Sequence, residues 1–346
     1  MSQRREFIRE VGAWSLCGLA GPALSASPAG AQARQRVSLT VPGPGNLLYL
    51  PLSLAPQIGA DAAEGLALDL RFVGGGPLAL RQMLDRNSDF SAAGLSAAAL
   101  QRISGNPLVC IAPLTRVPAY TLLVRQSLSK QVRKISDLRG LVLGVKGYAP
   151  GGRSTSQLFT EFLLARAGLR VDQVNYVSVG QAFKNQQAAL ASGTVDALMG
   201  DEPFATQLQQ SKEAFVLAEF HDLKQTRELL GGLFLNACLT TRADMVADRP
   251  EMVGKVVRMV TRSLVWLAQK PAAEVVSALA IDDSGEREAL LSVLLKHKGI
   301  FSPDGRMSAE QIASTERFLH ATEPTPAAQA FMLQSMVNAR WAGTSP

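Results

Sequence analysis

The sequence is poor in the residues that build metal centres. Its 346 residues include three histidines, and His221, His297 and His320 each lack a Cys or His neighbour at the spacing of a metal site. We therefore predict no metal and no cofactor, and we interpret the histidines as surface or packing residues.

Common catalytic motifs are missing as well. Residues 94–98 read G-L-S-A-A and lack the last glycine of a G-x-S-x-G nucleophile elbow. Residues 147–154 read G-x-x-x-x-G-R-S, where Arg153 replaces the lysine that a phosphate-binding P-loop requires. No histidine lies near the glycine-rich turns described below. The sequence therefore predicts a protein that is not an enzyme.

Long runs of one charge are absent. The net charge is +6, and aromatic residues make up 6% of the chain without a Lys/Arg run between them. Residues 1–33 hold three arginines and two glutamates, so the rest of the chain carries +5. This weak and dispersed balance suits a small anionic ligand and does not indicate a nucleic-acid partner.

The first 33 residues have the layout of an export signal. A charged start with Arg4, Arg5 and Phe7, resembling a twin-arginine signal, precedes a short apolar run and an A-x-A end. The run is too short to span a bilayer. We expect cleavage after Ala33 and a periplasmic product, and the absence of ATP in that compartment also argues against the P-loop interpretation.

The cysteines leave one alternative open. Cys17 follows Leu16, where a lipoprotein signal has a small residue. Cys110 and Cys238 each lie in an apolar run, where a buried free thiol is the usual state. A disulfide between them is possible in an oxidising compartment, and the sequence does not decide the question.

Strands and helices are predicted to alternate along most of the chain. The expected strands cover residues 36–41, 66–73, 89–93, 108–113, 120–125, 141–145, 174–179, 195–199 and 214–219. Glycine turns and helices follow several of them. This alternation favours parallel sheets, whose strand ends converge on one ligand-binding edge.

The chain after the signal is longer than a single hydrophobic core usually supports, so we expect two lobes. Residues 34–120 plus 236–346 would form lobe I, and residues 121–235 would form lobe II. From Arg242 the chain is predicted to be helical, including helices over 308–322 and 326–341, with no strand after about Thr241. Such a tail usually packs on one lobe and seldom carries the site.

The most informative turn lies within residues 141–169. An apolar strand, typical of a buried one, is followed by the turn K-G-Y-A-P-G-G. After this turn comes a helix that Ser154, Thr155 and Ser156 can cap. The free N–H groups and the dipole of such a helix start attract an anion, and Arg153 adds a fixed positive charge. The alternative is a turn that is glycine-rich for steric reasons only.

Three sequence blocks carry a family resemblance. They are LSLAPQIGADAAEGLALDLRFVGGGPLALRQMLDRNSDFSAAGLS, DLRGLVLGVKGYAPGGRSTSQLFTEFLLARAGL and ALASGTVDALMGDEPF. In order and spacing they resemble the periplasmic solute-binding proteins of nitrate, sulfonate and taurine type ABC transporters, over roughly residues 37–220. That family also includes bicarbonate binders and binders of thiamine-precursor pyrimidines. Residues 59–62 are small where family members commonly have bulk, and Arg153 is not a fixed family feature.

The resemblance implies an α/β, two-lobed periplasmic-binding-protein fold (type II-like). Each lobe would be a mixed, mainly parallel sheet flanked by helices, with a helical C-terminal tail. The protein would be a monomer that closes on a small-molecule ligand by hinge bending and delivers it to an inner-membrane ABC permease and its ATPase. A sensor, a tripartite carrier or an enzyme on the same scaffold are the alternatives.

By position, the resemblance implies a set of ligand-binding residues in the turns. They are Gly75, Gly76, Gly94, Ser96, Thr115, Arg116, Gly152, Arg153, Ser154, Thr155, Asp201 and Glu202. Hydroxyls and helix N–H groups would hold an oxyanion with an arginine beside it. Asp201 is interpreted as a helix cap and dipole partner, and Glu202 as a residue that could accept hydrogen bonds from an amine or aminopyrimidine. An arginine and a carboxylate on opposite lobes would suit a zwitterion or polar heterocycle better than nitrate.

Overall fold

Two five-stranded sheets organise the chain, and the first combines four strands from the N-terminal part with one strand that follows the second sheet in the sequence. The computed structural model describes residues 33–146 and 152–345, and Arg34–Pro346 forms one compact unit. The strand order is β2-β1-β3-β10-β4. The bounds are β1 (Gln35–Pro42), β2 (Leu66–Val73), β3 (Phe90–Gly94), β4 (Leu108–Pro113) and β10 (Ala237–Arg242). Every residue of β3 and β10 is buried, as expected for central strands.

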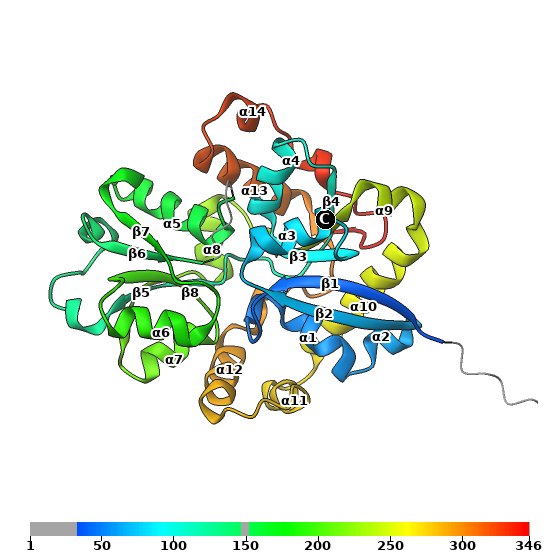
Figure 1. The fold of residues 1–346 in the computed structure, drawn as a ribbon, viewed down its shortest axis with the longest axis horizontal. Helices are drawn as coiled ribbons and strands as arrows, with labels where there is room; N and C mark the ends of the chain where they lie inside the picture. The colour runs from blue at the N-terminus through cyan, green and yellow to red at the C-terminus, as the bar shows by residue number, and fades with distance from the viewer. Residues whose placement is uncertain (1–32, 147–151, 346) are drawn as a thin grey trace, which may run out of the picture. The chain divides into compact units, whose positions relative to one another are not determined.

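The second sheet is built from the middle of the chain, with the order β7-β6-β8-β5-β9. Its strands are β5 (Tyr120–Arg125), β6 (Val142–Val145), β7 (Asn175–Ser178), β8 (Ala197–Asp201) and β9 (Ala214–Glu219). Strand β6 pairs in parallel with β7 and β8, and β5 pairs antiparallel with β8 and β9. Figure 1 shows this sheet in green beside the blue and cyan first sheet.

The two sheets have the same topology. In each, the fourth strand in spatial order runs opposite to the other four, and that strand is the one that enters from the other sheet, β10 in the first and β5 in the second. The prediction of two mixed, mainly parallel sheets is confirmed. We call the halves built on the first and second sheets lobe I and lobe II; their residue boundaries stay a prediction.

Helices cover both faces of each sheet, and most begin at the end of a strand. Figure 1 shows α5 on one side of the second sheet and α6 and α7 on the other. The longer helices are α1 (Leu50–Gln57), α3 (Gly76–Leu84), α4 (Leu95–Ile103), α5 (Thr155–Arg166), α6 (Phe183–Ala191), α7 (Phe204–Gln210), α8 (Leu223–Leu230), α10 (Pro250–Gln269), α11 (Ala272–Ala278), α12 (Ser284–His297) and α13 (Ala309–Thr322). The short ones are α2 (Ala60–Ala63), α9 (Ala243–Asp248) and α14 (Pro326–Gln329). Within the described residues, no helix combines the length and apolarity needed to cross a bilayer.

The C-terminal tail differs from its prediction in two ways. The helix expected over 326–341 ends at Gln329, because the chain beyond it runs beside β4, where Val337 bridges Cys110 and Asn338 N–H donates to the Cys110 carbonyl at 2.8 Å. Two short strands, β11 (Met307–Ser308) and β12 (Thr344–Ser345), pair in parallel, so the expectation of no strand after about Thr241 is wrong.

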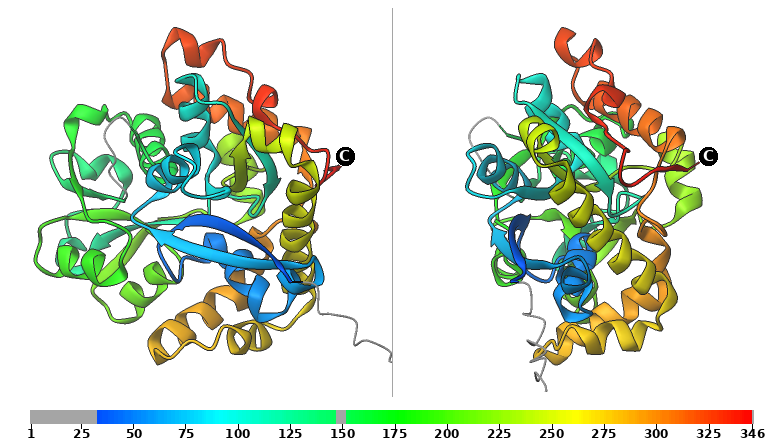
Figure 2. Two further views of the ribbon diagram at one scale, coloured as in Figure 1. Left: turned by 45° about the vertical axis from the view of Figure 1, so that its right-hand side comes forward. Right: turned by 90° about the vertical axis from the view of Figure 1, so that its right-hand side faces the viewer.

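The tail also contacts both lobes, where we expected it to pack on one. Helix α10 packs against α1 and α2 of lobe I, whereas α12 contacts α7 and α13 contacts α5, both in lobe II. In Figure 1 and in the left view of Figure 2, the orange α12 lies below the green helices of lobe II. The buried face of α10 carries an apolar stripe of Val253, Val256, Val257, Val260 and Leu264.

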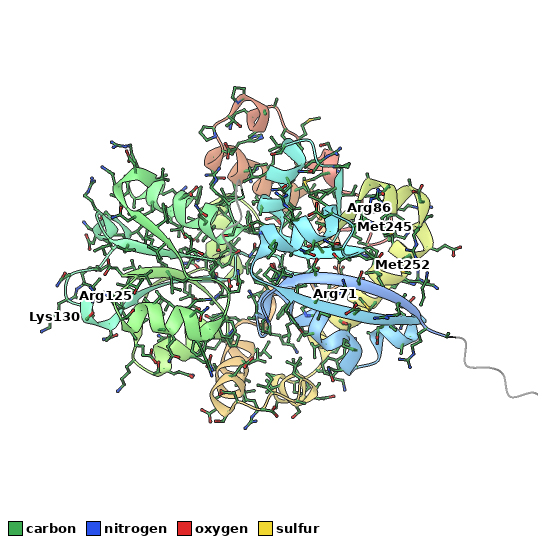
Figure 3. The ribbon with its side chains drawn as sticks, in the orientation of Figure 1. Arg71, Arg86, Arg125, Lys130, Met245 and Met252 are labelled. Carbon is green, nitrogen blue, oxygen red and sulfur yellow. The ribbon has the colours of Figure 1, made fainter. Side chains whose placement is uncertain are left out.

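Basic side chains are spread over both lobes. Figure 3 shows Arg71 on lobe I and Arg125 and Lys130 at the far end of lobe II. An Arg71 nitrogen lies 2.6 Å from Asp69, and Arg125 Nε lies 2.9 Å from Asp196. The positive balance of the sequence is therefore distributed and partly neutralised by neighbouring carboxylates.

Candidate functional site

Turns from both lobes meet at one small cavity. Because β1, β3, β6 and β8 all end at the edge that faces the other lobe, the turns and helix starts that follow them lie close together. The cavity has a volume of about 30 Å³. Its lining residues are Pro42, Asn46, Leu48, Tyr49, Gly76, Gly94, Ala97, Tyr120, Ser154, Thr155, Ser156, Gln181 and Asp201. Five predicted site residues are among them: Gly76, Gly94, Ser154, Thr155 and Asp201.

The lobes touch directly at Gly94 and Thr155. A Cβ atom added to Gly94 would lie 2.1 Å from Thr155 Oγ1 and 2.5 Å from Thr155 Cβ. Thr155 Oγ1 also accepts a hydrogen bond from the Ala97 backbone N–H at 3.1 Å. The first turn of α4 in lobe I is thus held against the first turn of α5 in lobe II. The lobes are closed in this structure, and the glycine is what permits the approach.

Asp201 is the charged centre of the cavity. Lys146 Nζ lies 2.7 Å from Asp201 Oδ1, and both side chains are almost fully buried. Asn46 of lobe I donates from Nδ2 to Asp201 Oδ2 at 2.9 Å. Burial lowers the pKa of Lys146, while the charge of Asp201 opposes that shift. The carboxylate therefore joins a lysine of its own lobe to an asparagine of the other.

Two buried tyrosines, Tyr49 and Tyr120, form the aromatic part of the wall. Burial raises the pKa of Tyr49 and of Tyr120, and the charge of Asp201 raises both further, so both phenols are neutral at pH 7. Tyr120 OH donates to Asn236 Oδ1 at 3.2 Å. Lys146 Nζ lies 5.6 Å from the centre of the Tyr120 ring, within range of a cation–π contact.

The hydroxyl groups have different roles. Ser154 is the N-cap of α5, as the sequence predicted, and its Oγ accepts from the Gln157 N–H at 3.2 Å. Ser154 Oγ and Ser156 Oγ lie 3.0 Å apart at the cavity wall. Ser96 is buried in the first turn of α4 but is not a lining residue, and its Oγ has no hydrogen-bond partner among the described residues.

The two predicted arginines do not line the cavity. One Arg153 nitrogen lies 2.6 Å from Glu161 Oε2 and another contacts Glu323, so two carboxylates already neutralise this guanidinium. Arg116 donates from Nε to the Gly299 carbonyl at 2.8 Å and lines a separate pocket under α10. Burial lowers the pKa of Arg116, with a smaller effect from the charge of Arg227.

The remaining predicted residues also lie away from the cavity. Thr115 Oγ1 accepts from the Ala237 N–H at 3.0 Å inside lobe I. Glu202 points away from Asp201 into lobe II, where Oε2 accepts from Thr206 N–H at 3.0 Å. Glu202, and not Asp201, is therefore the carboxylate that accepts from the first turn of α7, whose N-cap residue is Pro203. Gly75 and Gly152 are not lining residues, and Gly152 borders residues 147–151 of the glycine turn, which lie outside the described residues, as does most of the predicted export signal.

Sequence reasoning missed Asn46, Tyr49, Tyr120, Lys146 and Gln181. A positional signal was available, because Lys146 directly follows β6, while Asn46 and Gln181 stand in the turns after β1 and β7. Tyr120 begins β5, the reversed strand, whose first residue lies at the same edge. Applying the strand-end rule to every strand would have found these four.

The sequence comparison decides the family. A sequence model of the NMT1/THI5-like family matches residues 50–274, which include every strand of the two five-stranded sheets except β1. The chain belongs to the NMT1/THI5-like family. This agrees with the resemblance stated above, since solved structures with the same fold include sulfonate-binding periplasmic proteins. A comparison with curated protein sequences gives no significant match.

Three solved structures illustrate how the NMT1/THI5-like chain compares. A protein from Bordetella bronchiseptica superimposes with a TM-score of 0.80 at 24% identity, covering 90% of this chain and 96% of that one. The alkanesulfonate-binding protein SsuA from Xanthomonas axonopodis pv. citri, bound to MOPS, gives 0.69 at 18% identity, covering 88% and 98%. The desulfurization enzyme DszB gives 0.63 at 17% identity, covering 89% and 98%. These likenesses show the periplasmic-binding-protein fold.

Proposed function

We propose that this protein is a periplasmic solute receptor that binds a small anionic or zwitterionic molecule of the sulfonate type between its lobes. It would deliver that molecule to an ABC importer composed of an inner-membrane permease and its ATPase. The observation that carries the proposal is the inter-lobe cavity, where the first turns of α3, α4 and α5 meet Asp201 and where Lys146 lies directly behind that carboxylate.

The charges favour a zwitterion. The backbone N–H groups that begin α3, α4 and α5, together with the Lys146 ammonium, suit sulfonate oxygens. The Asp201 carboxylate suits an ammonium group of the same molecule. This division agrees with the MOPS-bound relative, because MOPS carries a sulfonate and a basic amine. Lys146 thus takes the place that the sequence had given to Arg153.

The size of the cavity supports hinge bending. A volume of about 30 Å³ holds one or two water molecules but no alkylsulfonate. A ligand of that class therefore enters only when the lobes separate, which breaks the contacts of Asn46 with Asp201 and of Ala97 with Thr155. On closure the contact of Ala97 with Thr155 re-forms, while the ligand takes the place of the contact between Asn46 and Asp201 and so enlarges the cavity.

A thermal-shift screen of residues 34–346 tests the proposal. The panel contains nitrate, bicarbonate, alkyl- and aminosulfonates including taurine and MOPS, aromatic carboxylates and aminopyrimidines. A ligand at 100 times its Kd adds about 2.7 kcal/mol to the free energy of unfolding. We expect an aminosulfonate to raise the melting temperature of the wild type, and Lys146→Met and Asp201→Asn to abolish that rise.

Lys130→Met is the matched control, because Lys130 is exposed at the far end of lobe II. It should respond to the same ligand as the wild type does. A sulfonate response that survives in Lys146→Met and Asp201→Asn would overturn the assignment of the cavity. A panel without any sulfonate or other anionic response would overturn the ligand class.

A polar heterocycle is the second candidate, and the tyrosines favour it. Tyr49 and Tyr120 offer aromatic surface beside a carboxylate that can accept hydrogen bonds from an amino group. An aminopyrimidine of the panel that outcompetes every sulfonate would select this alternative. Recovery of the ligand unchanged after incubation separates a receptor from an enzyme such as DszB, which shares the fold.

A further inference from the structure

Two histidines that are 76 positions apart in the sequence lie together at the end of β9. The rings of His221 and His297 are 4.9 Å apart. Glu219 Oε1 lies 2.9 Å from His221 Nδ1 and 2.9 Å from His297 Nε2. One ligand atom from each of these residues lies within 4.8 Å of the other two. The argument that the histidines lie too far apart to share a site is therefore wrong for this pair, while their interpretation as surface or packing residues is not tested by it.

The cluster lies in a polar pocket of its own. The pocket has a volume of about 130 Å³ and is distinct from the inter-lobe cavity. His221 is buried, whereas the side chains of His297 and Glu219 are 25% and 43% exposed, so one side of the cluster is open to solvent. An ion could therefore reach the three groups without unfolding of the lobe.

We propose that Glu219, His221 and His297 form a binding site for a divalent transition-metal ion such as Zn²⁺. Two imidazoles and one carboxylate are a donor set that Zn²⁺, Co²⁺ and Ni²⁺ accept. Donors at 2.0–2.1 Å from a tetrahedral ion lie roughly 3.3 Å from one another. The 2.9 Å separations in the structure widen to that value with side-chain shifts of about half an ångström. Water would complete the coordination.

The second nitrogen of His221 is placed as such a site requires. A metal-bound histidine usually donates its other ring N–H to a carboxylate or another oxygen, which fixes the tautomer. His221 Nε2 lies 3.4 Å from Thr121 Oγ1 and 3.7 Å from Glu202 Oε1. With Nε2–H directed to these oxygens, Nδ1 keeps its lone pair for the ion.

The site would connect the tail to lobe II. Glu219 and His221 come from the end of the edge strand β9, whereas His297 is the last residue of α12. Glu219 is also the β-ladder partner of Thr121, next to the start of β5, where the chain enters lobe II. A bound ion would therefore fasten α12 to the segment through which the two lobes are joined.

Metal titration of the untagged protein after EDTA treatment tests this inference. We expect one Co²⁺ per chain, with the d–d absorption of a four- or five-coordinate site, and displacement of Co²⁺ by Zn²⁺. His221→Ala and His297→Ala should each weaken binding by at least about 100-fold, and Glu202→Gln by about 10-fold or more. His320→Ala is the matched control, since His320 Nε2 contacts the Phe331 carbonyl far from the cluster, and it should bind as the wild type does.

His297→Cys tests whether a loss of metal binding in the alanine variants is only a loss of folding. It replaces one ligand by another, so it should retain Co²⁺ and add a thiolate-to-cobalt charge-transfer band. A hydrogen-bonded His–Glu–His cluster without metal affinity would give no stoichiometric binding to any variant and would overturn the proposal. Binding that persists at wild-type strength in His221→Ala and His297→Ala would also overturn it. The sulfonate screen is run on protein treated with EDTA in the same way, so that either result is independent of the inter-lobe ligand.

Discussion

Gly94→Ala should prevent closure of the lobes without harming the fold of either one. The backbone of Gly94 (φ −65°, ψ 129°) is ordinary for alanine, so the substitution causes no backbone strain. The three atoms nearest to the added Cβ all belong to Thr155 of lobe II, at 2.1, 2.5 and 3.3 Å. The steric conflict therefore exists only when the lobes are together.

The magnitude follows from two losses in the closed state. Relieving the overlap by moving Thr155 costs about 1–3 kcal/mol, as other overpacked sites do. The same movement breaks the hydrogen bond from the Ala97 N–H to Thr155 Oγ1, a loss of about 1 kcal/mol. A closed state raised by about 2–4 kcal/mol weakens the apparent ligand affinity roughly 30- to 700-fold.

The assay is calorimetric titration with the strongest sulfonate of the thermal-shift panel. Gly74→Ala is the matched control, because its added Cβ would meet nothing closer than Leu78 Cδ2 at 3.9 Å. The double variant Gly94→Ala/Thr155→Gly removes the clashing atoms and should recover most of the affinity. If Gly94→Ala binds within twofold of Gly74→Ala, the closed arrangement described above is not the state that holds the ligand.

Three further predictions concern stability and are checked by urea unfolding. Burial alone would raise the pKa of Glu64, but hydrogen bonds from Arg258 and Arg262 of α10 hold that pKa below 4.5. Glu64→Gln should therefore lower the free energy of unfolding by about 1–2 kcal/mol at pH 7, and by nothing once the pH falls below the lowered pKa. Burial lowers the pKa of Lys146 despite Asp201, so the native state binds fewer protons than the unfolded chain, and wild-type stability relative to Lys146→Met should rise with pH between that lowered pKa and 10.5. Phe159→Ala should cost about 3–5 kcal/mol, because Phe159 is fully buried among aromatic rings that include Phe318.

The sequence was sufficient for most of the architecture. Apolar runs bounded by polar or turn-forming residues placed strands 66–73, 108–113, 120–125 and 214–219 at their observed bounds, because the change in composition at each end is visible in the sequence. The helix expected over 326–341 failed for a tertiary reason. The chain after Gln329 pairs instead with the edge strand β4, at Val337 and Cys110, and no local sequence pattern reveals such a distant partner.

The site was predictable by position and much less by chemistry. The strand-end rule selected Gly94, Thr155 and Asp201 correctly as cavity residues. It could not show that Arg153 is neutralised by Glu323, because that carboxylate comes from the tail, 170 positions away. The same limit applies to the pairing of His221 with His297, which depends on where α12 packs.

The crossing between the lobes explains which contacts can survive opening. Phe220 N–H donates to the Tyr120 carbonyl and Ala119 N–H to the Phe220 carbonyl, both at 2.9 Å, so the outgoing and returning segments are joined to each other. The Phe159 ring of α5 packs edge-on against Phe220 at 5.0 Å and is tilted by 44° against Tyr120 at 5.7 Å between ring centres. In the proposed binding cycle these residues would form the hinge.

The tail helices pack beside these crossing residues. This position explains how the tail can contact both lobes although the proposed binding cycle separates them. Phe318 of α13 meets Phe159 at 5.9 Å, and His297 of α12 meets Glu219 at 2.9 Å, next to the crossing residues. A rotation about an axis through the hinge moves nearby atoms little and distant atoms most. The Phe318 and His297 contacts can therefore persist while Thr155 leaves Gly94, and a metal ion held by His297 would stiffen the hinge without blocking the ligand.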